Sequence, residues 1–147
     1  MTNPTRSKLN KIGGFLLLLA VLTACSSKSE ADKLTKELRT VTSWVATAEM
    51  TGEAWTQGNV PTPYTKQTLS TAQKKLHKQT EAIAQLSYDP TQLNKIVEHL
   101  QRLESTVNRM STSVEQQDRS AIAHQLQQLS KQEQTITVLA SRAGEQP

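Results

Sequence analysis

Apolar residues recur at alternating intervals of three and four along most of this chain, and this spacing constrains the fold more than any other feature. Such a repeat places its members on a single stripe of an α-helix. Only 3% of the residues are aromatic, which disfavours strand-rich sandwiches and barrels. The pattern therefore predicts an all-α fold. The first stripe consists of Leu34, Leu38, Val41, Val45, Ala48, Gly52 and Trp55.

Turn and capping signals divide the periodic region into four helices. Gly58 suits the residue just past the end of the first helix. We expect Thr62 to cap the second helix, Asp89 the third, with Pro90 at its first position, and Asp118 the fourth. The last boundary is the weakest, because the Gln and Glu residues around it are good helix formers, and one long helix there is an alternative. The predicted helices span about 30–57, 63–87, 90–114 and 118–143.

Four helices joined by short turns predict an antiparallel four-helix bundle with up-down-up-down topology. No internal repeat of fixed period is present, which disfavours a solenoid. The same heptads are typical of coiled coils, so a homo-oligomer is also compatible with the sequence.

The first 24 residues differ from the rest of the chain. Arg6, Lys8 and Lys11 precede an apolar run over 12–22, a layout typical of a secretory signal peptide. The run is shorter than the roughly 20 residues that a membrane-spanning helix needs. Without these three cations, the 17 Lys and Arg of the whole chain nearly balance its 13 Asp and Glu. A nucleic-acid-binding surface is therefore not expected.

The segment Leu22-Thr23-Ala24-Cys25 resembles the bacterial lipobox. The resemblance implies that signal peptidase recognises Leu22, Thr23 and Ala24 and cuts before Cys25. It also implies that the thiol of Cys25 receives a diacylglycerol before this cut, and that the new amino terminus is usually acylated after it. An ordinary secretory signal followed by a free thiol is the alternative.

This resemblance predicts three parts of the chain: a cleaved signal peptide (1–24), the lipidated cysteine with a short tether (25–29), and the bundle (30–147). Acyl chains hold a protein stably on a membrane when two or more are present. The residue after the cysteine is Ser26 rather than Asp, which favours the periplasmic side of the outer membrane in a Gram-negative cell.

The sequence contains none of the common catalytic or cofactor motifs. Glu-x-x-His pairs, Cys-x-x-Cys-His, glycine-rich phosphate loops and Gly-x-Ser-x-Gly are all missing, and a single cysteine excludes an internal disulfide. His77, His99 and His124 fall on three different predicted helices, each next to a core position. We therefore predict a protein without catalytic residues, cofactor or metal.

Two features could carry a binding function. Trp55 and Tyr64 flank the loop at the end far from Cys25, where they predict either a docking tip or aromatic rings that close the bundle. Gln79 interrupts the second stripe, and Gln132 and Glu133 interrupt the fourth. These three could form a buried polar layer that fixes helix pairing or lines a ligand cavity; alternatively, their side chains turn outward.

Together these features predict a lipid-anchored, extracytoplasmic and non-catalytic module for binding or scaffolding in the bacterial envelope. Its expected partners are the membrane, through the lipid on Cys25, and an unknown protein. One alternative is an accessory subunit of a membrane complex, since the predicted architecture resembles the PsbQ-like lipid-anchored bundles of cyanobacterial photosystem II, without a shared motif. The other is a small-ligand carrier with a cavity around Gln79 and Gln132.

Overall fold

The computed structural model describes the backbone of residues 10–144 and the side chains of residues 30–143. Its four α-helices are α1 (Asn10–Thr56), α2 (Thr62–Ala84), α3 (Pro90–Glu115) and α4 (Arg119–Gly144). No strand occurs among the described residues. Within the same part of the chain, no helix has an apolar stretch long enough to cross a bilayer.

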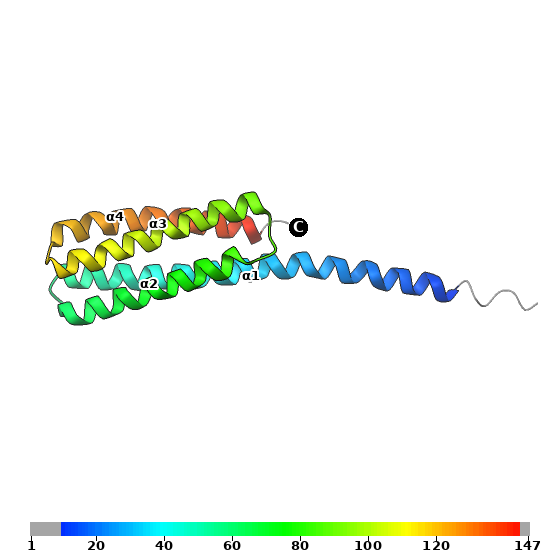
Figure 1. Cartoon of the computed structure of the whole chain (residues 1–147), viewed down its shortest axis with the longest axis horizontal. Coiled ribbons are helices and arrows are strands. Elements are labelled where there is room, and N and C mark those ends of the chain that lie inside the picture. The colour runs from blue at the N-terminus through cyan, green and yellow to red at the C-terminus, as the bar shows by residue number, and fades with distance from the viewer. Residues whose placement is uncertain (1–9, 145–147) are drawn as a thin grey trace, which may run out of the picture.

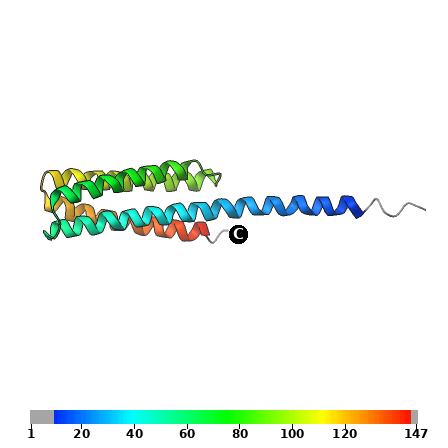
Figure 2. The same ribbon diagram turned by 90° about the horizontal axis from the view of Figure 1, so that it is seen from below.

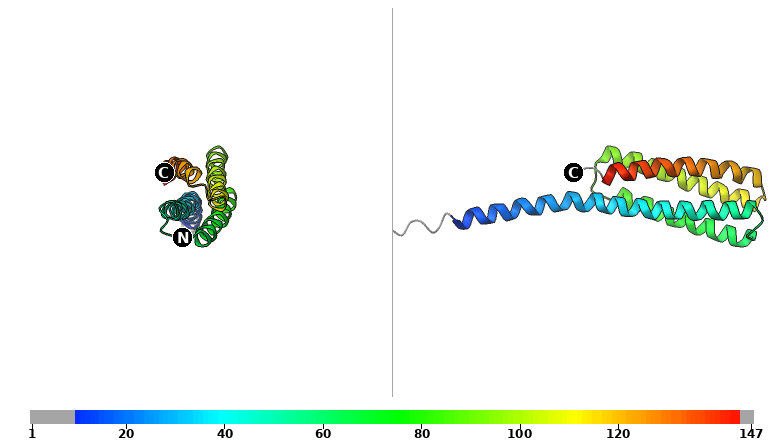
Figure 3. Two further views of the ribbon diagram at one scale, coloured as in Figure 1. Left: turned by 90° about the vertical axis from the view of Figure 1, so that its left-hand side faces the viewer. Right: turned by 180° about the vertical axis from the view of Figure 1, so that it is seen from behind.

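The helices form the predicted antiparallel four-helix bundle (Figures 1 and 2). Viewed end-on, they occupy four corners in the order α1, α2, α3, α4, and each packs against its two neighbours (Figure 3). The α2–α3 turn and the C-terminal part of α4 lie at the end from which α1 projects, here called the basal end. The α1–α2 and α3–α4 turns form the opposite, distal end.

The predicted stripes become the core of the bundle. All seven stripe residues of α1 are buried, and so are the seven of α3. Gly52 is the one member of the α1 stripe without a side chain, and a Cβ there would come within 2.7 Å of Met110 Cε on the diagonal helix α3. The α3 members are Leu93, Ile96, Leu100, Leu103, Val107, Met110 and Val114.

Two helix boundaries differ from the prediction. α1 begins at Asn10 rather than near residue 30, so the expected tether 25–29 is helical, because no Gly or Pro lies between Gly14 and Gly52. α2 ends at Ala84 rather than at residue 87. There the amide of Ser87 donates to Glu30 Oε2 of α1 at 3.0 Å instead of continuing the helix.

The predicted N-caps are confirmed for two helices and wrong for one. Asp89 Oδ1 accepts from the Gln92 amide at 2.8 Å, and Asp118 Oδ1 accepts from the Ala121 amide at 2.9 Å. Thr62 lies inside α2, which Pro61 precedes without a side-chain cap. The Thr62 hydroxyl is used elsewhere, as described below.

The break between α3 and α4 is present, and Gln117 accounts for it. This residue has a φ of 56°, in the left-handed region that favours glycine. The next amide, of Asp118, donates to Ser113 O at 2.9 Å, which closes α3 in the same way that Asn59 and Ala54 close α1 around Gly58. The chain thus uses a glycine at one distal turn and a glutamine at the other.

Gln117→Gly is expected to stabilise the fold by about 1 kcal/mol, because glycine adopts a positive φ without the steric cost that a Cβ imposes. Gly58→Ala is the matched control, since Gly58 has a φ of 78° with open space around it, and it should lose a similar amount. Urea unfolding followed by circular dichroism measures both. Destabilisation by Gln117→Gly would contradict this account of the turn.

Candidate functional site

The residues of the lipobox lie outside the part of the chain whose side chains are described. The backbone at Cys25 belongs to α1, five residues before Glu30, which contacts the α2–α3 turn through Ser87. Five residues of α-helix rise about 8 Å, so the Cys25 backbone lies about that far beyond the basal end.

At the distal end, the Trp55 ring takes the second of the two roles that the sequence left open, that of closing the bundle. Trp55 is only 5% exposed, and its Nε1 donates to the Thr62 hydroxyl at 3.0 Å. The Arg119 guanidinium at the start of α4 lies 5.7 Å from the ring centroid. Trp55 therefore closes the bundle by contacting two other helices, because it occupies a stripe position and finds a partner for its N–H.

Tyr64 differs from Trp55, since it is 54% exposed on the first turn of α2. Of the two aromatic residues predicted at the distal end, only Tyr64 offers its ring to solvent.

The predicted polar layer is not formed by its three members together. Gln79 lies on α2, whereas Gln132 and Glu133 lie on α4, and these two helices occupy opposite corners and are not packed as neighbours. All three side chains are half-buried. The sequence indicated the common direction of the two helices, but it did not indicate that the other two helices separate them.

In α2, the core position assigned to Gln79 belongs to Thr80. Thr80 is 7% exposed and follows Leu76 by four residues and precedes Ile83 by three, which fits the stripe equally well. Its hydroxyl contacts the Leu76 carbonyl at 3.0 Å and the Glu104 carboxylate of α3. The signal for this position in the sequence is a small polar residue at the correct interval from Leu76 and Ile83.

The contact between Thr80 and Glu104 belongs to a polar cluster across α2 and α3. Glu104 Oε2 lies 3.1 Å from His77 Nδ1, and His77 Nε2 lies 3.5 Å from Glu81 Oε1. The buried hydroxyl of α2 and the imidazole of α2 thus both contact Glu104 of α3, and the cluster links the two helices.

A second set of polar contacts joins α3 to α4. The Thr106 hydroxyl donates to Gln132 Oε1 at 3.1 Å, and Gln125 Nε2 donates to the Ser113 hydroxyl at 3.0 Å. The two pairs are seven residues apart on both helices. Gln132 thus has a hydrogen-bond partner on α3 rather than on α2. The other three residues of these contacts were not predicted: Thr106, Ser113 and Gln125.

On the side of α4 that packs against α1, acidic residues of the two helices lie close together. Glu49 borders a cleft of about 220 Å³ that Glu53, Leu126, Gln127 and Ser130 also line. Its Oε1 is buried without a hydrogen-bond partner. Burial raises the pKa of Glu49 to about 7, and the nearby carboxylates of Glu133 and Glu53 contribute in the same direction.

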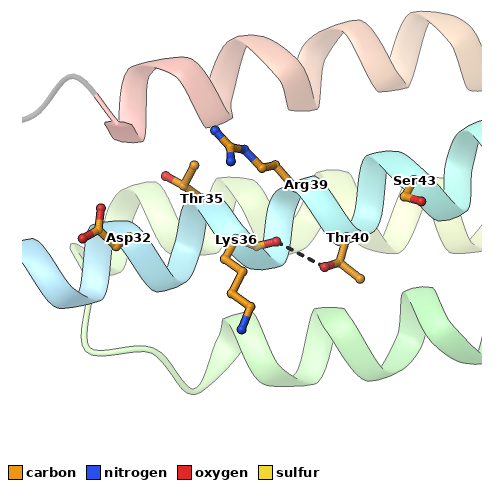
Figure 4. A pocket seen from close by; sticks show the side chains of 6 residues that line it. All are labelled: Asp32, Thr35, Lys36, Arg39, Thr40 and Ser43. Atoms are coloured by element: carbon orange, nitrogen blue, oxygen red, sulfur yellow. Dashed lines mark hydrogen bonds between the residues drawn. The ribbon is translucent and has the colours of Figure 1, made fainter.

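Among the described residues, no group of three or more His, Cys, Asp or Glu side chains is arranged to hold a metal ion. A hollow on the surface of α1 is lined by six residues of that helix alone, and Figure 4 labels them. In this view Arg39 extends toward α4 and Lys36 toward α2. The hollow is therefore a polar helix surface rather than an enclosed site.

No protein-family model, curated protein or solved structure matches the chain.

Gln79→Leu is expected to stabilise the bundle by about 1 kcal/mol, because Gln79 Oε1 is buried without a partner and a leucine removes that unpaired group. The corresponding rise in melting temperature is about 3–5 °C. Gln67→Leu, on the exposed face of the same helix, is the control and should leave the melting temperature nearly unchanged. A fall in melting temperature for Gln79→Leu would contradict the buried environment assigned to this amide.

Proposed function

We propose that this protein is a lipid-anchored, extracytoplasmic helical bundle that acts as a non-catalytic binding or scaffolding module in the bacterial envelope. The observation that carries the proposal is the segment Leu22-Thr23-Ala24-Cys25, which directly follows a basic stretch and an apolar run. Acyl chains on Cys25 confine the bundle to a membrane surface. Confinement raises its effective concentration beside partners in the same membrane.

The arrangement of the bundle is consistent with this role. α1 continues from the basal end toward Cys25, so an anchor there leaves the distal end pointing away from the attachment point (Figure 1). The exposed Tyr64 ring lies at that distal end and is a suitable contact for a protein partner. The exposed Tyr64 favours one version of this function, in which the protein is an accessory subunit of a membrane complex.

Cys25→Ser is expected to abolish lipid attachment, because a serine hydroxyl does not replace the thiol that carries the diacylglycerol. Cells grown with radiolabelled palmitate should label the wild-type chain and not the variant, and the variant should leave the membrane fraction once its signal is removed. Intact mass of the purified wild-type chain should correspond to residues 25–147 plus the lipid. Ser26→Ala is the matched control and should be labelled like the wild type.

An unlabelled wild-type chain would overturn the proposal. So would a Cys25→Ser variant that is cleaved normally and still stays on the membrane.

A further inference from the structure

A cleft of about 260 Å³ opens between α3 and α4 near the basal end. Ile96 is 2% exposed and Leu139 is half-buried, so these two residues supply an apolar wall. Lys95 and Arg142 are exposed and supply two positive charges, and Gln92 completes the lining. The cleft thus combines an apolar surface with cations drawn from two helices.

Neither cation of this cleft is neutralised by a described carboxylate. Lys33, Lys66 and Arg102 each form an ion pair with a glutamate, at 2.7 Å for Lys33 and 2.8 Å for Lys66. Among the described residues, Lys95 and Arg142 have no such pair. Two positive charges that no described carboxylate pairs with, beside an apolar wall, are complementary to an anion that carries an apolar chain.

The position and size of the cleft narrow the choice of anion. Lys95 lies near the start of α3 and Arg142 near the end of α4, so both are close to the end from which α1 leads to Cys25. Sites for drug-sized ligands occupy about 300–1,000 Å³. The smaller cleft suits a head group and the first methylenes of its chains rather than a whole amphiphile.

We propose that this cleft binds the phosphate of an anionic phospholipid from the membrane in which Cys25 is anchored. Lys95 and Arg142 contact the phosphate oxygens, Gln92 donates to the head group, and Leu139 contacts the adjoining methylenes. Binding there holds the α3–α4 side of the bundle against the membrane surface. The anchored bundle then has a defined orientation relative to the membrane. The inference rests on the proposed lipid anchor.

The test is a titration of the purified, lipidated chain in a neutral detergent with dioctanoyl phosphatidylglycerol, followed through the backbone amide NMR signals of Ile96 and Leu139. Lys95→Gln/Arg142→Gln should weaken the apparent affinity by about tenfold or more, since each basic residue near an anionic surface contributes about fivefold. Lys74→Gln/Lys78→Gln on α2 removes the same charge from exposed positions and should bind like the wild type. Dioctanoyl phosphatidylcholine, which has the phosphate but no net charge, should bind at least tenfold more weakly.

Equal losses in the two double variants would overturn the site, since they indicate diffuse attraction to net charge. Equal binding of the two lipids, or signal changes remote from α3 and α4, would do the same. Inorganic phosphate that saturates the same signals at the same concentration would assign the cleft to the free ion instead of the lipid. Thermal melts verify that both double variants are folded. If one of them is not, the positions of the wild-type amide signals that change with the lipid decide whether the cleft is the site.

The intact mass of the same sample separates this inference from the proposed function. A chain that carries lipid on Cys25 and ignores phosphatidylglycerol overturns only the cleft. A chain without lipid that binds phosphatidylglycerol at Ile96 and Leu139 overturns the anchor, and with it the link between the cleft and an anchoring membrane, but leaves the head-group site itself.

Discussion

Trp55→Ala is expected to lower the free energy of unfolding by about 3–5 kcal/mol. The ring is 5% exposed at the distal end of the core, and its removal leaves a cavity where α1, α2 and α4 meet. It also removes the donor to the Thr62 hydroxyl. Because whole domains are stable by only about 5–15 kcal/mol, the loss is a large fraction of the total. Urea unfolding followed by circular dichroism measures it.

Tyr64→Ala is the control for this variant and the informative probe of partner binding. Tyr64 is 54% exposed, so its truncation should change stability by less than about 0.5 kcal/mol. Loss of partner binding in Trp55→Ala alone therefore indicates a damaged bundle. Loss of partner binding in Tyr64→Ala indicates a direct contact between Tyr64 and the partner. A Trp55→Ala variant as stable as Tyr64→Ala would contradict the closing role of Trp55.

The second large effect is a decrease in stability as the pH rises through the range in which Glu49 ionises. The pKa of its carboxyl is about 7 in the folded chain and near 4.5 when unfolded, because folding buries the group beside Glu133 and Glu53. Between pH 4.5 and 7 the folded state binds the proton and the unfolded state releases it, so the free energy of unfolding falls with rising pH. Above about pH 7 the full penalty is present.

We expect this penalty to be about 1–2 kcal/mol, because the side chain is only half-buried and water screens part of the effect. Glu49→Gln removes the ionisation, so the variant should exceed the wild type in melting temperature at pH 8 and approach it at pH 4.5. Asp32→Asn, which removes an exposed carboxylate from the same helix, is the matched control variant. A constant difference between Glu49→Gln and wild type across this range would contradict the assignment.

The sequence predicted the elements of this fold well because local rules govern them. The stripe from Leu34 to Trp55 determined which face of α1 is buried, and the carboxylates of Asp89 and Asp118 marked the starts of α3 and α4. The end of α2 was predicted less well. It depends on Glu30, whose carboxylate accepts from the Ser87 amide across 57 positions of the chain.

The candidate sites were predicted less completely, because they depend on which helices are neighbours. Gln132 was singled out correctly as an unusual polar residue, yet its partner Thr106 carries no mark in the sequence that distinguishes it from an exposed threonine. Gln79, three residues after Leu76, was assigned to the second stripe, although Thr80, four residues after Leu76, fits a helical stripe equally well. The cleft between Lys95 and Arg142 brings together residues near the ends of two different helices.

The amino-acid sequence by itself determined the helices, their directions and the positions of their buried faces, since spacing, capping and turn residues act within a few positions of one another. It also carries the lipobox resemblance on which the proposed anchor depends. Only the tertiary structure decided that α2 and α4 stand at opposite corners, that Trp55 is enclosed while Tyr64 is exposed, and that Glu49 faces Glu133. These outcomes follow from packing between segments far apart in the chain, for which a single sequence contains no local signal.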